Sequence, residues 1–190
     1  MDLSIIIFLL GGLFLGWSLG ANDAANVFGT AVGTRMVRFK TAAIVCSIFV
    51  ILGAIISGAG TTETLGKLGA INALPGAFAA CVAAGISVYL MTKVGLPVST
   101  TQAIVGAIVG WNLYTGSATN IKVLITILGT WVLCPVIAGL IAMGFFTLTK
   151  NFLLKRKLHI LRLDAYTRTA LLLAGAVSYT HLTLPTNVAV

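Results

Sequence analysis

The stretch Gly20–Arg35, GANDAANVFGTAVGTR, decides the fold, because it places one carboxylate and two amides at the end of an uncharged apolar run. The run covers Leu3–Gly20, and Asn22, Asp23 and Asn26 follow it at once. Polar side chains at that depth are costly in hydrocarbon, so they should face protein, water or an ion. The surrounding glycines and alanines permit close helix packing and the dihedral angles of an unwound helix. The sequence therefore predicts a helix that is broken at a polar site inside a membrane.

The composition places the chain among integral membrane proteins. Of its 190 residues, 58% are hydrophobic and 8% are charged, and the mean hydropathy is +1.07. A soluble domain carries about 25% charged residues, so a soluble enzyme is excluded. The net charge of +8 comes largely from short basic loops rather than from a nucleic-acid-binding surface. Three cysteines lie in apolar runs without CxxC spacing, and they are expected to be small packing residues.

The apolar runs predict an all-α membrane domain with about five membrane segments in residues 1–149. The N-terminal run lacks a basic leader and is too long for a signal-peptide core, so it is expected to be a first span. A short polar loop is expected at Thr61–Gly69. Residues 150–168 are basic and are expected to begin a cytoplasmic linker, and residues 169–176 begin a further span. The five expected segments are Leu3–Ala21, Thr41–Gly60, Ala70–Met91, Val94–Trp111 and Ile121–Thr149.

The basic residues predict the orientation. If the loop 35–40, Lys93 and residues 150–168 share one side, that side carries ten basic residues and the other carries two, Lys67 and Lys122. The positive-inside rule then makes the crowded side cytoplasmic and the N-terminus external, in the plasma membrane. This arrangement requires Val94–Trp111 to cross completely. The pattern leaves open the alternative that this segment is a re-entrant hairpin.

The C-terminal residues do not continue the apolar run that begins at residue 169. Val177–Thr186, VSYTHLTLPT, resembles the translated read-through of a transposon adaptor from sequencing libraries. We therefore expect the natural sequence to end near Ala176 and residues 177–190 to be non-native. A genuine short polar C-terminus is the alternative. His181 accordingly receives no functional role.

The cluster Asn22, Asp23 and Asn26 has the chemistry of a cation site. One carboxylate and neighbouring amide oxygens are hard ligands that suit Na⁺, and the carboxylate can also carry a proton. Carbonyl groups exposed by a broken helix would complete such a site. The structural alternative is a helix cap, in which Asp23 would cap a helix that begins at Ala24.

A second polar cluster has the chemistry of an anion site. Pro97 removes a backbone hydrogen bond, and Ser99, Thr100 and Thr101 stand directly before an apolar helix. Hydroxyl groups and free N–H groups at a helix N-terminus bind anions without any lysine or arginine. Ordinary capping by serine and threonine is the alternative here. Arg35 and Lys93 border the two clusters. They either assist anion binding or are simply charged residues of the loops. One cation-type and one anion-type cluster together suggest cation-coupled anion transport.

GANDAANVFGTAVGTR together with GLPVSTTQAIVGAIVG resembles the inorganic phosphate transporter (PiT) family of cation–phosphate symporters. The resemblance covers roughly residues 3–173. It implies a fold of two inverted repeats, each of which supplies one ND motif and one STT motif to a shared site. It also implies that Asn22, Asp23 and Asn26 form the cation site, with Asp23 and Asn22 as metal ligands if the cation is Na⁺. Ser99, Thr100 and Thr101 would contact phosphate.

The sequence differs from the family pattern at two points. Gln102 stands where many members have histidine, so a titrating imidazole is absent there. Gln102 and Thr30 are candidates for supporting positions around the site. In addition, only one repeat is present, so the chain is expected to be a transporter half with broken helices that lacks its second repeat.

The expected function is therefore phosphate symport with Na⁺ or H⁺ by alternating access, and not enzymatic catalysis. Transport of another oxyanion such as sulfate, or an anion channel, is the alternative. The expected partners are inorganic phosphate, the lipid bilayer and the missing second repeat, and a homodimer is also considered. No cofactor is expected besides the coupling ion.

Overall fold

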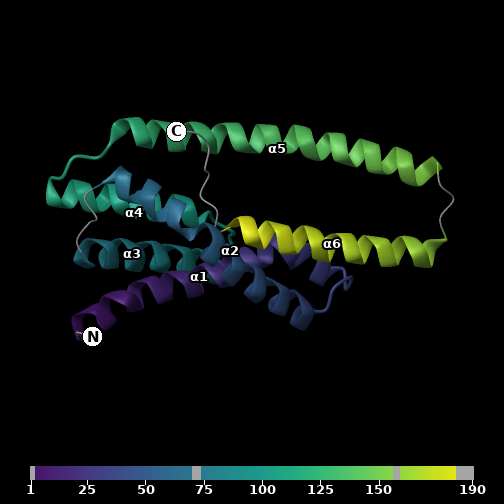
Figure 1. Cartoon of the computed structure of the whole chain (residues 1–190), viewed down its shortest axis with the longest axis horizontal. Coiled ribbons are helices and arrows are strands. Elements are labelled where there is room, and N and C mark those ends of the chain that lie inside the picture. The colour runs from purple at the N-terminus through teal and green to yellow at the C-terminus, as the bar shows by residue number, and fades with distance from the viewer. Residues whose placement is uncertain (1–2, 70–73, 156–158, 183–190) are drawn as a thin grey trace.

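A computed structural model of the chain describes residues 3–69, 74–155 and 159–182. These residues form helices and connecting turns without any strand (Figure 1), so the all-α prediction is confirmed. Four of the helices contain stretches long and apolar enough to cross a membrane, Ile6–Gly33, Phe39–Ile56, Leu74–Lys93 and Ile121–Phe152. The helices are α1 (Leu3–Gly33), α2 (Phe39–Leu68), α3 (Leu74–Lys93), α4 (Thr100–Thr115), α5 (Ile121–Lys155) and α6 (Ile160–Leu182).

Helix α1 is continuous, so the predicted break at Gly20–Arg35 is wrong. The helix passes through Asn22, Asp23 and Asn26 and ends at Gly33. Glycine and alanine permit an unwound backbone but do not impose one, and alanine is also the best helix former. Asp23 therefore lies inside a helix and does not cap one.

The second predicted interruption is confirmed. Between α3 and α4 the chain leaves the helical conformation, and Pro97 lies in this connection of residues 94–99. Proline disfavours the helical conformation in the residue before it and has no N–H to donate. The broken element of the fold is therefore the α3–α4 pair.

Several other boundaries differ from those expected. The predicted polar loop at Thr61–Gly69 is wrong, because α2 continues to Leu68. Residues 150–155 belong to α5 and residues 160–168 to α6, while residues 156–158 lie outside the described part. A helix can extend past the apolar portion of its sequence, so hydropathy alone places its end too early. Residues 177–182 continue α6 and residues 183–190 lie outside the described part, so the non-native tail stays a prediction.

Helices α1 and α3 run side by side in the same direction. The ring of Phe78 lies against Gly11, and farther along the pair the ring of Phe14 lies against Gly85. Glycine at these positions gives each ring room to approach the neighbouring backbone, which is how membrane helices pack closely. The parallel arrangement places the C-terminal ends of α1 and α3 toward the same end of the molecule.

Helix α4 returns antiparallel to α3. The ring of Trp111, near the end of α4, lies against Gly76 at the start of α3. The N–H of Asn120, just before α5, donates to the carbonyl of Leu68 at 3.0 Å. Leu68 also belongs to a buried cluster with Ala80, Val105 and Ile108, against which α5 packs Val123, Leu124 and Ile127.

The connection between α3 and α4 does not reach the end of α1. It lies beside Asn22, whose side chain contacts Val98. Another ten residues of α1 follow Asp23 before the helix ends at Gly33, which is a length of about 15 Å at the usual helical rise. The α3–α4 pair is thus a helical hairpin with its turn at the depth of the polar cluster.

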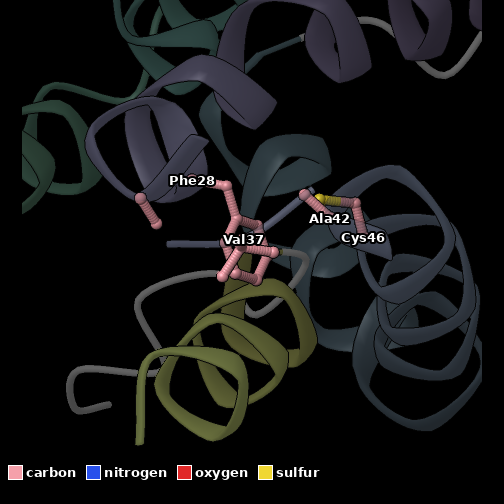
Figure 2. Close-up of a cluster of buried hydrophobic side chains, with 5 residues drawn as sticks. Phe28, Val37, Ala42 and Cys46 are labelled. Carbon is pink, nitrogen blue, oxygen red and sulfur yellow. The ribbon is translucent and has the colours of Figure 1, made fainter. Parts of the chain in front are cut away.

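A second buried cluster joins α1, α2 and α6. Figure 2 shows Phe28 and Val37 lying close together, with Ala42 and Cys46 of α2 beside them. Leu171 and Leu172 of α6 pack on this cluster, and Gly175 lies directly against the Phe28 ring. Helices α2 and α6 therefore form the other flank of α1.

Replacing Gly85 by leucine should loosen the α1–α3 pair. A β-carbon at Gly85 would stand 2.7 Å from a ring atom of Phe14 and 3.4 Å from the Cα of Leu15. Overpacking of this kind costs about 1–3 kcal/mol, so the apparent Tm in detergent should fall. Gly129→Leu on α5 is the matched control, because a β-carbon there meets no atom within 4 Å. Equal melting temperatures for the two variants would contradict this packing.

Candidate ion-binding site

The two polar clusters of the sequence meet where the hairpin turn contacts α1. The side-chain amide of Asn22 donates to the carbonyl oxygen of Val98 at 2.6 Å, and the N–H of Val98 donates to Asn22 Oδ1 at 3.4 Å. Val98 lies outside the helices, so its N–H and carbonyl groups have no partner within a helix. Asn22 pairs with both of them. Only 3% of Asn22 is exposed. This contact fixes the hairpin turn against the middle of α1.

Asp23 carries a buried negative charge next to this contact. Its carboxylate accepts a hydrogen bond from Asn22 Nδ2 at 3.0 Å and also pairs with the side chain of Thr100. The residue is 6% exposed, and no lysine or arginine in the described ranges forms an ion pair with it. An unpaired buried carboxylate is costly, so this position favours a bound cation or a proton.

The N-terminus of α4 brings the hydroxyl cluster to the same place. Ser99 is the N-cap of α4, and its Oγ accepts a hydrogen bond from the N–H of Gln102 at 3.3 Å. The capping interpretation therefore holds for Ser99. Thr100 is partly buried toward Asp23, whereas Thr101 and Gln102 are exposed. The positive end of the α4 dipole consequently lies beside the Asp23 carboxylate.

Other residues expected at the site lie apart from this contact. Asn26 and Thr30 follow Asn22 at intervals of four along α1, and both are exposed. Arg35 lies beyond the end of α1 with φ 59°, a conformation uncommon for a residue other than glycine. The ammonium of Lys93 lies 5.5 Å from the centre of the Tyr89 ring. The buried part of the site thus consists of Asn22, Asp23, the Val98 backbone and Thr100.

Two hydroxyl groups near the site were not predicted from the sequence. Thr92 Oγ1 lies 3.3 Å from Asn22 Oδ1, and it also donates to the carbonyl of Val88 at 2.8 Å. Ser18 lies one turn before Asn22 on α1 and is 1% exposed. The four-residue spacing from Asn22 could have identified Ser18. Nothing in the sequence connects Thr92 with Asn22, because 70 residues separate them.

These groups can bind a small cation and an anion side by side. Carboxylate, amide and hydroxyl oxygens are the ligands that hard cations prefer. Within the described ranges, no three His, Cys, Asp or Glu side chains gather as they do in a transition-metal site. The α4 N-terminus, with the Thr100 and Thr101 hydroxyls, has the donors that an oxyanion needs.

The known proteins to which this chain is similar are phosphate transporters and permeases. The sequence profile described as "Phosphate transporter family" matches residues 19–188. A protein of Thermococcus kodakarensis named "Putative phosphate permease" is 34% identical over 167 residues, which cover 83% of this chain and 41% of that protein. A "Sodium-dependent phosphate transporter" of Plasmodium falciparum is 33% identical over 156 residues, covering 76% of this chain and 23% of that protein.

A solved structure has the same fold. The structure titled "The sodium-dependent phosphate transporter" superposes with a TM-score of 0.72 at 26% identity. The superposition covers 96% of this chain and 55% of the solved chain. The chain thus spans 41% of the length of its Thermococcus relative and just over half of the solved structure.

Proposed function

Because this chain belongs to the phosphate transporter family, we propose that it forms the N-terminal half of a symporter that moves inorganic phosphate together with Na⁺ or H⁺. The observation that carries the proposal is the contact between Asp23 and Thr100. It joins the cation-type cluster on α1 to the anion-type cluster at the start of α4. A cation held at Asp23 would offset the charge of an anion at the α4 N-terminus, so each ion would favour binding of the other.

The proposed roles follow the position of each residue. Asp23 attracts the cation, with Asn22 beside it, and Thr101 donates a hydroxyl hydrogen bond to phosphate. Thr100 has a single hydroxyl proton, which pairs with Asp23, and it turns to phosphate once a cation neutralises that carboxylate. Ser99 caps α4 and so fixes the direction of its dipole. Asn26 lies one turn after Asn22 on α1 and is exposed. We assign it to the interface with a second repeat, where it would complete the cation site.

The proposed orientation places the N-terminus outside and residues 34–40 in the cytoplasm. The direction of α1 supports this, because it places the basic loop after α1 at one end of the molecule, whereas Lys93 lies in the hairpin turn at the depth of the polar cluster. Figure 1 shows α5 running along the same axis in the same direction, so residues 150–155 lie toward that end as well. Basic residues concentrated on one side are the signature of the cytoplasmic face.

Phosphate uptake tests the function. The complete coding sequence, as it stands in the source genome, is expressed in cells that lack their own phosphate uptake, and radiolabelled phosphate is supplied with Na⁺ or choline at two pH values. We expect accumulation that follows one cation gradient. Unlabelled sulfate is the competitor that separates phosphate from other oxyanions. Three results would contradict the proposal. They are an ion current that needs no coupled gradient, phosphate uptake that sulfate abolishes, and the absence of uptake by correctly inserted protein.

Replacing Thr100 by valine should weaken phosphate binding while preserving insertion. Valine has nearly the shape of threonine but lacks the hydroxyl, and a hydrogen bond to a charged group contributes about 1.5–3 kcal/mol. The half-saturating phosphate concentration should therefore rise by about tenfold or more. Thr147→Val on α5 is the control, since Thr147 is exposed and bonds to the carbonyl of Met143. An unchanged half-saturating concentration would remove Thr100 from the phosphate site.

A further inference from the structure

An apolar groove separates α1 from α2. It has a volume of about 740 Å³ and begins near the loop that joins the two helices, between Gly33 and Phe39. It follows α2 as far as Val50, which is a distance of about 17 Å at the usual helical rise. Ser47 also lines it, but its hydroxyl already donates to the carbonyl of Ala43 at 2.9 Å. Figure 2 shows part of the apolar wall, formed by Phe28, Ala42 and Cys46.

The groove suits a hydrocarbon chain. Both helices contain stretches apolar enough to cross a membrane, so the groove opens toward lipid rather than water. Gly20, Gly29 and Gly33 line its α1 side, and each has open space where a β-carbon would stand. A chain can therefore lie directly against the helix backbone. One leaflet of a bilayer is about 15 Å of hydrocarbon, half of the usual 30 Å, and the groove along α2 has nearly this length.

Positive charge borders the loop end of the groove. Arg35, Arg38 and Lys40 lie there, and all three side chains are exposed. In the part of the chain that the structure describes, none of them forms an ion pair. Asp164 on α6 does not balance them, because it pairs with Arg168 at 2.7 Å. The apolar groove thus ends at cations that lack a negative partner.

The loop that carries these cations is held in a fixed position. Arg168 Nη1 donates to the carbonyl of Met36 at 3.0 Å, and the N–H of Met36 donates to the carbonyl of Ala31 at 2.9 Å. Val37 is buried, with 6% of it exposed. The positive end of the α2 dipole adds to the charge, because its N-cap, Arg38, offers the helix no side-chain acceptor. A fixed set of positive groups loses little conformational freedom when it binds an anion.

We propose that the groove between α1 and α2 binds one anionic phospholipid from the leaflet on the basic side of the membrane. An acyl chain lies in the groove, and the headgroup phosphate lies at Arg35, Arg38 and Lys40. A zwitterionic lipid would bring an ammonium group to the same loop, so the charges favour an anionic headgroup. Asn26, which we assign to the interface with a second repeat, does not line the groove. The inference goes beyond the proposed function and is tested without any transport measurement.

The stability of the purified protein in lipid tests the headgroup site. Protein from the complete coding sequence is melted in detergent with increasing phosphatidylglycerol, or with phosphatidylcholine that has the same acyl chains. Phosphatidylglycerol should raise the Tm of the wild type at much lower concentration than phosphatidylcholine. In Arg38→Gln/Lys40→Gln the half-saturating concentration of phosphatidylglycerol should rise about thirtyfold, which corresponds to about 2 kcal/mol.

Lys150→Gln/Arg162→Gln is the matched control. It removes the same charge from the basic side of the molecule, and both side chains are exposed and lie outside the groove. It should respond to phosphatidylglycerol as the wild type does. Equal losses in the two double variants would show a general attraction between a basic surface and anionic lipid, and would overturn the inference.

Gly29→Leu tests the acyl chain. Leucine would fill part of the groove without a clash, because no described atom lies within 4 Å of a β-carbon at Gly29. The half-saturating concentration of phosphatidylglycerol should rise about tenfold or more. Gly12→Leu is the control, since Gly12 has the same open space on α1 but lies outside the groove. A normal response of Gly29→Leu would show that the phosphate binds without the groove, and would overturn the inference.

The second repeat is the other candidate to cover this groove. In that case Gly29→Leu would lower the Tm relative to Gly12→Leu before any lipid is added. The wild type would also respond equally to phosphatidylglycerol and phosphatidylcholine. This pair of results would overturn the inference and assign the groove to the contact between the repeats.

Discussion

Replacing Asp23 by asparagine is expected to abolish cation-coupled phosphate uptake while leaving the protein folded and inserted. Asp23 is 6% exposed, and its carboxylate has no cationic side-chain partner in the described ranges. A cation about 4 Å away gains about 4 kcal/mol from such a charge at an effective dielectric constant of 20. Losing this attraction corresponds to roughly a thousandfold loss of cation affinity. Uptake against Na⁺ concentration and against pH should therefore show no coupling in Asp23→Asn.

Asp164→Asn is the matched control for this prediction. Asp164 is an exposed aspartate on α6, and it pairs with Arg168 at 2.7 Å. Exposed ion pairs contribute little to stability, so coupling should be preserved in this variant. Equal amounts of both variants at the membrane would exclude a folding defect. If Asp23→Asn kept the cation dependence of the wild type, the carboxylate could not be the cation ligand.

Replacing Asn22 by alanine is expected to detach the hairpin turn from α1. The amide bonds to both the carbonyl and the N–H of Val98, and alanine can replace neither bond. A buried backbone group left without a partner costs about 1–3 kcal/mol. The apparent Tm in detergent should fall, and the backbone N–H groups of residues 96, 98 and 99 should exchange hydrogen faster. Phosphate uptake should fall as well, because Thr100 would lose its place beside Asp23.

The matched control for the Asn22 variant is Asn151→Ala. Asn151 is exposed near the end of α5, so its replacement should change neither the melting temperature nor the amide exchange of residues 96, 98 and 99. Slow exchange of these amides in Asn22→Ala would show that other contacts hold the hairpin turn.

The helical membrane fold could be predicted from the sequence, but the conformation of α1 could not. Crossing a membrane depends on length and hydropathy, and both are properties of the local sequence. A break in a helix depends on whether its polar side chains find partners. In α1, Asn22 finds its partner at Val98, 76 residues away. The same glycines and alanines are compatible with either outcome, so the local sequence favoured a break that did not occur.

The two halves of the candidate site were predictable to different degrees. Pro97 and the following hydroxyls act locally, so the interruption before α4 and the capping by Ser99 follow from sequence chemistry. The approach of Thr100 to Asp23 depends on how the hairpin packs on α1, and only the family resemblance implied that the two clusters share a site. Thr92 was missed because its hydroxyl is significant only through that packing.

The depth of the hairpin turn has an electrical consequence. Residues 24–33 of α1 continue beyond Asp23 toward the basic end of the molecule. They cover about 15 Å, or about half of a 30 Å hydrocarbon layer. A full crossing of one elementary charge is worth about 2.3 kcal/mol per 100 mV of membrane potential. An ion that passes between Asp23 and the basic side therefore traverses about half of the field, and this part of its path contributes about 1.2 kcal/mol per 100 mV.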